Sequence, residues 1–227
     1  MCCLWCDEAI IPEINWSNII LLPKPKTLCD DCKSKLKILH GNRCKKCSRS
    51  SEEVICKDCS RWEGQTAQTD PLQFNYSIFS YNQQMQDIIT KWKYRGDYCL
   101  GNIFKDKFVQ GFKDTFSFLS KDIRIVPIPL STERLKERGF NQAQMLAGFL
   151  PYKQKDVLKR IHGEKQSKKT RQERLITSNP FIITERLNKP VVLVDDIYTT
   201  GTTIRHAAVL LKEQGCTEVY AYTLIRG

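Results

Sequence analysis

Cysteine is distributed unevenly along the 227 residues of the chain. Nine of the eleven cysteines fall within the first 59 residues, and eight of these nine form four C-x2-C pairs. A C-x2-C turn presents two sulfurs on one side of a tight loop, and two such turns complete a tetrahedral four-thiolate metal site. The sequence therefore predicts an N-terminal double zinc-ribbon module, residues 1–64, with two metal sites. The predicted ligands are Cys3, Cys6, Cys29, Cys32, Cys44, Cys47, Cys56 and Cys59.

Zinc is the metal that this pattern favours. Disulfides need an oxidising compartment, and the start MCCLWCDEAI has neither the basic nor the apolar region of a secretory signal. Iron is the main alternative, because four thiolates suit it too. The protein supplies all four ligands of each site, so both zinc ions are expected to be structural.

The cysteine pattern leaves the pairing open. Joining neighbouring pairs is simplest, but a cross-braced arrangement of alternate pairs fits the same spacing. Cys2 could take the place of Cys3 as a ligand. Cys99 and Cys216 stand alone in the remainder of the chain and are predicted to be small core residues.

Charge is concentrated in the middle of the chain. The formal net charge is +11, and residues 65–190 alone carry +10. Residues 159–174 hold seven basic and two acidic side chains, a density that attracts phosphates or a nucleic-acid backbone, although a solvated basic loop has the same composition. No stretch approaches the roughly 20 apolar residues of a membrane span. We therefore expect a cytoplasmic protein without a membrane span.

The remainder of the chain, residues 73–227, has an α/β pattern after a polar linker over 65–72. Residues 74–81 and 123–130 have the β-branched and aromatic content of strands. Helical spacing of apolar residues covers 83–94, 100–119 and, with a break near Gly139, 134–150. This alternation predicts a parallel sheet with helices on both faces.

The segment 190–225 is the most informative part of this domain. Val191–Val194 form a continuous apolar run, as expected for a buried parallel strand. Two carboxylates, a Thr/Gly turn, a helix over 204–214 closed by Gly215, and a strand over 219–224 follow. Open α/β sheets bind ligands at the carboxyl ends of such strands, so we expect a ligand site at this turn.

The residue types in this turn match a sugar phosphate. A turn that ends at a helix N-terminus exposes unpaired N–H groups and favours an anion. Asp195 and Asp196 are suited to sugar hydroxyls or to a Mg2+ shell. A phosphate would be repelled by carboxylates unless the two contact different parts of the ligand, which a ribose 5-phosphate allows. The predicted phosphate cradle consists of Thr199, Thr200, Gly201, Thr202 and Thr203.

The thirteen residues VVLVDDIYTTGTT (191–203) resemble the phosphoribosyl pyrophosphate signature of type I phosphoribosyltransferases. The wider arrangement of a double zinc ribbon followed by KYRGD (93–97), VPIPL (126–130) and RGFNQ (138–142) resembles the competence protein F (ComF) family over nearly the whole chain. The resemblance implies a type I phosphoribosyltransferase-like fold.

The same resemblance implies roles for individual residues. Asp195 and Asp196 would bind the ribose hydroxyls, and the cradle would bind the 5-phosphate of phosphoribosyl pyrophosphate carried with Mg2+. The turn after 126–130 resembles the pyrophosphate loop, with Arg138 as the basic side chain. Residues 160–178 resemble an arm that covers the site, with family-like positions at Gln166, Arg171 and Arg174, but the family's Asn falls two positions late, at Asn179.

One position departs from the purine salvage relatives. Thr199 stands where 6-oxopurine transferases have an Asp that assists proton transfer, and a Thr is a poor general base, which argues against purine salvage. The histidines His40, His162 and His206 are predicted to lie on the surface, away from any catalytic position.

Three functions remain. The first is a competence-type protein that handles incoming single-stranded DNA in natural transformation and uses its site to bind phosphoribosyl pyrophosphate or a nucleotide; Trp62 could stack bases, whereas Trp92 fits a core position better. The second is an active phosphoribosyltransferase with an unidentified acceptor. The third is a scaffold that docks onto a DNA-translocase partner.

Overall fold

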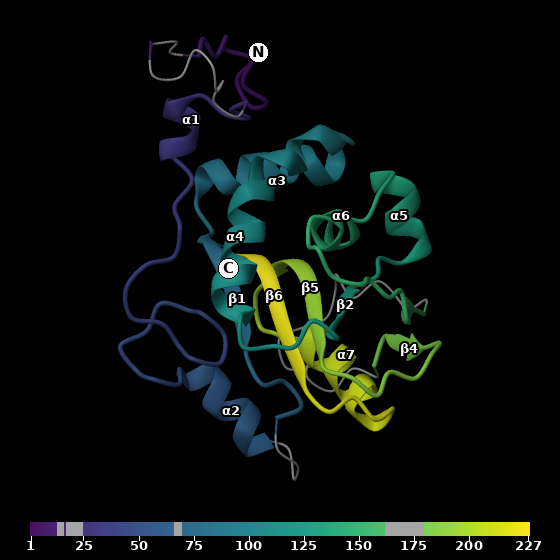
Figure 1. The fold of residues 1–227 in the computed structure, drawn as a ribbon. Coiled ribbons are helices and arrows are strands. Elements are labelled where there is room, and N and C mark those ends of the chain that lie inside the picture. The colour runs from purple at the N-terminus through teal and green to yellow at the C-terminus, as the bar shows by residue number, and fades with distance from the viewer. Residues whose placement is uncertain (13–15, 17–24, 66–69, 162–178) are drawn as a thin grey trace.

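A four-stranded parallel sheet forms the centre of the computed structural model, which describes residues 1–12, 16, 25–65, 70–161 and 179–227 (Figure 1). The strand order is β1-β6-β5-β2. The strands are β1 (Asn75–Ser80), β2 (Arg124–Pro127), β5 (Val191–Tyr198) and β6 (Val219–Arg226). The last strand in the chain thus lies inside the sheet, between the first strand and β5, and all three pairings are parallel. The predicted parallel sheet is confirmed.

Each face of the sheet has its own core. Val192 and Val194 of β5 point to one face, and Val191 and Leu193 point to the other, as strand geometry requires. Apolar residues of four helices cover the first face. These helices are α3 (Gln83–Tyr94), η1 (Tyr98–Phe104), α4 (Lys105–Phe116) and α6 (Gln142–Gly148). The second face packs against α7 (Thr202–Glu213) and against one of the cysteine groups.

The predicted helices are confirmed, and their ends follow from the sequence. The Asn82 side chain accepts a hydrogen bond from the Met85 N–H and so begins α3. The break expected near Gly139 separates α6 from α5 (Thr132–Arg138), because Gly139 adopts a left-handed conformation with φ of 77°. Asn141 then caps the start of α6 by accepting from the Ala143 N–H.

The N-terminal segment runs along one side of the sheet, from α1 (Asp30–Ser34) to α2 (Lys57–Gln65) (Figure 1). Residues 37–39 pair with the outer edge of β1, where the Leu39 N–H donates to the Ile78 carbonyl at 2.8 Å. The described end of the predicted linker over 65–72 packs against the domain that follows it. Leu72 is buried in the second core and the Asp70 side chain is almost fully buried against Arg205.

A second, antiparallel sheet consists of β3 (Leu158–Arg160) and β4 (Phe181–Ile183). Most of the chain between these strands, including Gln166, Arg171, Arg174 and His162, lies outside the described residues, as does most of the basic stretch 159–174. Within the described ranges, no helix combines the length and apolar character needed to cross a membrane.

Candidate functional site

A cleft of about 380 Å3 opens where β2 and β5 end. This is the place where an open parallel sheet binds ligands. Seven of the eight residues predicted from the sequence as its ligand-binding set line this cleft, and the eighth, Gly201, is the cap residue of α7. The seven are Arg138, Asp195, Asp196, Thr199, Thr200, Thr202 and Thr203.

The two adjacent carboxylates have different surroundings. Asp196 is 8% exposed and forms an ion pair with Lys93 of α3, whose Nζ lies 2.5 Å from its Oδ2. Asp195 accepts a hydrogen bond from the Asp196 N–H at 2.8 Å. Burial and the neighbouring Asp196 charge raise the pKa of the Asp195 carboxyl to about 7. One carboxylate is therefore neutralised by a cation, while the other titrates near neutral pH.

The turn between β5 and α7 has the shape of an anion cradle. Gly201 adopts a left-handed conformation with φ of 81° and is the N-cap of α7, so it directly precedes the first N–H groups of this helix. A side chain at Gly201 would collide with the Tyr198 hydroxyl and with Arg205. The Thr200 and Thr202 hydroxyls are hydrogen-bonded to each other at 2.9 Å on the cleft side.

The opposite wall of the cleft is the turn after β2 together with α5. The Asn141 side chain donates to the Ile128 carbonyl at 3.0 Å and so fixes this turn. Arg134 and Arg138 project into the cleft from α5. Arg138 donates to Gln142 Oε1 at 3.2 Å, whereas the buried Nε2 of Gln142 has no partner among the described residues. This wall combines two cations with an unused amide donor.

A third side of the cleft comes from β3 and α7. Arg160 lines it, and burial followed by the charge of Arg134 lowers the pKa of this guanidinium. His206 also lines the cleft, so its prediction as a surface residue away from the site is wrong. Burial and Arg160 lower the pKa of His206. Asn179 lies beside it and donates to the His206 carbonyl at 2.7 Å.

Several residues that line the cleft were not predicted from the sequence to bind a ligand. Lys93, Asn141 and Gln142 stood in the KYRGD and RGFNQ blocks, and Arg160 stood in the basic stretch 159–174, but none of them was predicted to be a ligand-binding residue. Arg134 belonged to no such block. The cations Lys93, Arg134 and Arg160 come from three separate elements that only the folded chain brings together.

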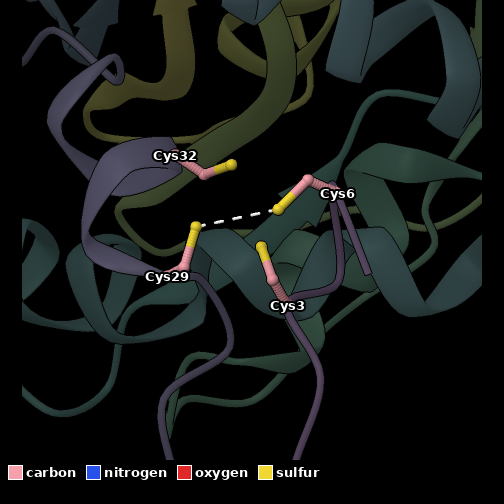
Figure 2. A group of neighbouring side chains, drawn as sticks. All are labelled: Cys3, Cys6, Cys29 and Cys32. Carbon is pink, nitrogen blue, oxygen red and sulfur yellow. Dashed lines mark hydrogen bonds between the residues drawn. The ribbon is translucent and has the colours of Figure 1, made fainter. Parts of the chain in front are cut away.

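The eight predicted metal ligands form two separate groups of four. Cys3, Cys6, Cys29 and Cys32 make the first group, whose sulfurs point toward one another (Figure 2). The second group contains Cys44, Cys47, Cys56 and Cys59. Neighbouring pairs are therefore joined, and the cross-braced arrangement is not the one adopted.

The two cysteine groups are built alike. In each, the first pair sits on a turn whose following residue has a positive φ, Asp7 at 63° and Ser48 at 62°. The second pair lies at the start of a short helix, α1 or α2. Cys2 is exposed, and its backbone instead pairs with that of Ala9 in an isolated antiparallel β-bridge.

The sulfur geometry fits a tetrahedral four-thiolate metal site. The four sulfurs of each group lie within 4.8 Å of one another, and the Cys6–Cys29 and Cys47–Cys56 sulfurs are each 3.7 Å apart. A metal at about 2.3 Å from each sulfur requires a similar separation. Both groups can therefore hold a metal ion of this type.

Ionisation of the thiols in the second cysteine group would be stabilised by a bound cation. A hydrogen bond from Cys59 and the nearby Arg226 charge lower the pKa of the Cys47 thiol to about 4, although burial opposes the shift. The same hydrogen bond, together with burial, raises the pKa of Cys59. Four thiolates so close together repel one another, and a divalent ion removes that penalty.

The two remaining cysteines differ. Cys216 is 3% exposed and its Sγ donates to the Leu187 carbonyl at 2.9 Å, as expected for a core residue. Cys99 is exposed, so its prediction as a core residue is wrong. It lies on the outer side of η1, whose neighbouring Leu100 is the residue that packs inward.

The family model of the phosphoribosyl transferase domain matches residues 136–227. Together with the parallel sheet and the cleft at its carboxyl edge, this match defines a phosphoribosyltransferase-type domain. The chain is 38% identical to Competence protein ComFC of Bacillus subtilis (strain 168), over 99% of this chain and 94% of that protein. It is 32% identical to Competence protein ComFC of Streptococcus pneumoniae (strain ATCC BAA-255 / R6), over 100% of both. The chain therefore belongs to the ComF family.

Two more distant similarities were found. DNA utilization protein YhgH of Escherichia coli (strain K12) is 25% identical over 88% of this chain and 96% of that protein. Among solved structures, a hypoxanthine phosphoribosyltransferase from Staphylococcus aureus superimposes with a TM-score of 0.33 and 20% identity, covering 56% of this chain and 62% of that one.

Proposed function

We propose that the cleft binds phosphoribosyl pyrophosphate or a 5′-nucleotide together with Mg2+, and that the protein handles single-stranded DNA during natural transformation. The observation that carries the first part is the separation of charges within the cleft. The carboxylates of Asp195 and Asp196 occupy one wall, and the anion cradle and the arginines occupy others.

This separation matches the chemistry of a phosphoribosyl ligand. The turn ending at Gly201 offers N–H groups to one phosphate. Arg134 and Arg138 can hold a diphosphate at the other end of the cleft. The carboxylates between them suit ribose hydroxyls or a Mg2+ shell.

Calorimetric titration of Mg2+-phosphoribosyl pyrophosphate tests the site. We expect binding by the wild type and loss of at least about tenfold in affinity in the double variant Asp195→Asn, Asp196→Asn, which removes the acceptors. The matched control is Asp87→Asn, Asp114→Asn, which removes two exposed carboxylates from α3 and α4. Absence of binding by the wild type would refute the proposed ligand.

The DNA part of the proposal is supported by an aromatic and basic surface at the edge of the cleft. Tyr94 is 67% exposed and Tyr98 52% exposed. The Arg138 guanidinium lies 5.6 Å from the centre of the Tyr94 ring, and Tyr98 packs edge-on against Phe140. Exposed rings beside cations are the features on which unpaired bases stack. The similar proteins named for competence and for DNA utilization agree with this role.

Fluorescence anisotropy with a labelled oligothymidylate tests DNA binding. We expect affinity to fall steeply with salt and to fall further, by about tenfold, in Tyr94→Ala, Tyr98→Ala. Phe118→Ala is the control, because Phe118 is 60% exposed but packs on Phe74 and Tyr220, near the amino ends of their strands. Binding that is independent of salt, or equal losses in both variants, would contradict the proposed surface.

An active phosphoribosyltransferase is the second candidate. The pKa of about 7 at Asp195 favours it, because proton transfer is most effective from a group that titrates near the operating pH. Release of pyrophosphate on addition of an acceptor from a metabolite panel would establish this activity, and Asp195→Asn should lack it. If no nucleotide, diphosphate or DNA binds, the scaffold for a DNA-translocase partner becomes the leading function.

We propose zinc in both cysteine groups. The thiolate-only ligand sets and the 3.7 Å sulfur separations support a small tetrahedral ion. Elemental analysis of the purified protein should give two zinc ions per chain and no visible absorption. A coloured protein containing iron would contradict this assignment.

A further inference from the structure

The N-terminal module contacts the anion cradle directly. Trp62 lies in α2, the helix that follows Cys56 and contains Cys59. Its indole N–H donates to the carbonyl of Thr200, 138 residues further along the chain, at 3.3 Å. Thr200 belongs to the turn that lines the cleft. A residue of the cysteine-rich segment is therefore hydrogen-bonded to the backbone that would receive a phosphate.

Behind the cradle lies a buried arginine held by the same part of the chain. Arg205, in the first turn of α7, is 3% exposed. Its Nε and Nη2 donate to the Asp70 carboxylate, at 3.2 and 2.8 Å, and its Nη1 donates to the Tyr198 hydroxyl at 2.7 Å. The guanidinium also lies 4.7 Å from the centre of the Trp62 ring. Trp62 and Asp70 thus enclose the cation against which the turn is packed.

The backbone of the turn lies directly against this cation. Any side chain at Gly201 would overlap Tyr198 and Arg205, which means that the backbone already lies in contact with them. Tyr198 is held on its other side by Arg226, which donates to the Tyr198 carbonyl at 3.0 Å and to Cys47 Sγ at 3.7 Å. The cradle is therefore held through contacts that involve Cys47, Trp62 and Asp70.

We propose that Trp62 and Asp70 are positioning residues for the anion cradle, and that they hold the Thr199–Thr203 backbone in the conformation that binds a 5-phosphate. The inference rests on the proposed phosphoribosyl site. It assigns to the N-terminal module a part in ligand binding, in addition to its part in the core. It also predicts that the effect is confined to the 5-phosphate end of the cleft, since Trp62 contacts Thr200 and Arg205 and Asp70 binds Arg205, all on the cradle side.

Two small ligands separate the two ends of the cleft. Ribose 5-phosphate reports on the cradle, and inorganic pyrophosphate reports on the arginine wall. In Trp62→Ala we expect the affinity for ribose 5-phosphate to fall by about tenfold, because the variant loses one hydrogen bond and the packing of the ring. The affinity for pyrophosphate should not change. Trp62→Phe, which keeps a ring over Arg205 but loses the N–H, should show about a threefold loss.

The matched control is Trp5→Ala. Trp5 lies between Cys3 and Cys6 in the first cysteine group, and its ring faces Lys91 at 5.7 Å rather than the cradle. This variant should bind both ligands as the wild type does. If Trp62→Ala does not fold, Asp70→Asn tests the same contact from the other side, since it removes the charge that orients Arg205. Equal losses for both ligands, or no loss for either, would overturn the positioning role.

Hydrogen exchange distinguishes failure of this inference from failure of the proposed function. If the wild type binds neither ligand, the phosphoribosyl site is wrong, but the contacts can still be measured. Faster exchange of the backbone amides of 198–204 in Trp62→Ala than in the wild type and Trp5→Ala would support the positioning role. Unchanged exchange in this segment would overturn it.

Discussion

At the scale of single residues, two adjacent carboxylates in β5 differ in their electrostatic surroundings. Asp196 is paired with Lys93, so its charge is already balanced inside the protein. The Asp195 carboxyl has its pKa raised to about 7, because burial and the Asp196 charge disfavour its ionisation. A buried carboxyl whose pKa is raised by a neighbouring charge is typical of ligand and catalytic sites.

The first prediction concerns pH. The ionised Asp195 is the stronger acceptor for ribose hydroxyls and is the form that binds Mg2+, so affinity for Mg2+-phosphoribosyl pyrophosphate should increase between pH 6 and pH 8. With the pKa at about 7, the loss at pH 6 is about tenfold. Calorimetry over this range measures the change. The ligand's own phosphates titrate too, so the difference from Asp195→Asn at each pH is the decisive quantity, and parallel profiles would contradict the prediction.

A second consequence of the raised pKa concerns the ligand-free protein. The folded state binds the Asp195 proton more tightly than the unfolded state, so this carboxyl reduces stability progressively as pH increases from about 4 to about 7. Asp195→Asn should therefore be more stable than the wild type at pH 8, by about 1 to 3 kcal/mol. Urea unfolding at pH 4 and pH 8 measures this, and a gain of the same size at both values would show another cause.

The third prediction concerns the glycine of the cradle. Gly201→Ala places a side chain at φ of 81° and into contact with Tyr198 and Arg205. We expect a loss of about 1 to 3 kcal/mol in the free energy of unfolding and weaker phosphate binding. Gly148→Ala is the control, because a Cβ there meets no atom within 4 Å. Unfolding in urea should leave the control within about 1 kcal/mol of the wild type.

At the scale of elements, the two cysteine groups differ in depth. All four residues of the second group are buried, and they share a core with the sheet and α7. In the first group, Cys6 is exposed and Cys29 is partly exposed, at the outer end of the module. The second group therefore lies wholly within one core, while the first contributes Cys3 and Cys32 to the other core and leaves Cys6 exposed and Cys29 partly exposed.

The fourth prediction follows from this difference. Cys47→Ser should lose one metal ion and reduce the free energy of unfolding by about 4 kcal/mol, because it also removes a core contact with Arg226. Cys6→Ser should lose one metal ion at a smaller cost, about 1 to 2 kcal/mol. Elemental analysis and urea unfolding give both values. Equal destabilisation would mean that the two groups contribute alike to the fold.

The elements with local signals were predictable from the sequence. The apolar run before Asp195, the Gly at position 201 and the four C-x2-C pairs each fix a short piece of backbone by local chemistry. The walls of the cleft were not predictable in the same way. Arg160 and Lys93 reach it from β3 and α3, and the contact from Trp62 to Thr200 depends on how the module packs on the sheet. The spacing of apolar residues along a short segment carries no information about such long-range contacts.

At the scale of the whole molecule, the boundary at residues 64–73 is a boundary in composition rather than in packing. The predicted domains 1–64 and 73–227 share both cores. Ser48 of the module accepts from the Ser77 N–H and donates to the Asn75 carbonyl within β1. Asp70 neutralises Arg205.

The fifth prediction is that a fragment of residues 73–227 does not fold alone. Its second sheet face would be exposed where the second cysteine group packs, and Arg205 would lack Asp70. Leaving a buried charge unpaired costs about 3 to 5 kcal/mol, which is a large share of the stability of a domain. Circular dichroism and the binding of a hydrophobic dye measure the outcome. A fragment that unfolds cooperatively with the stability of the full chain would show two independent domains.

The position of β6 inside the sheet also has a consequence for folding. Because β6 separates β1 from β5 but follows both of them in the chain, the two halves of the sheet can join only when β6 has paired with each. The second cysteine group packs on this sheet, and its Cys47 accepts a hydrogen bond from Arg226 of β6. The core therefore depends on pairings between residues far apart in the chain, which is the kind of contact that slows folding.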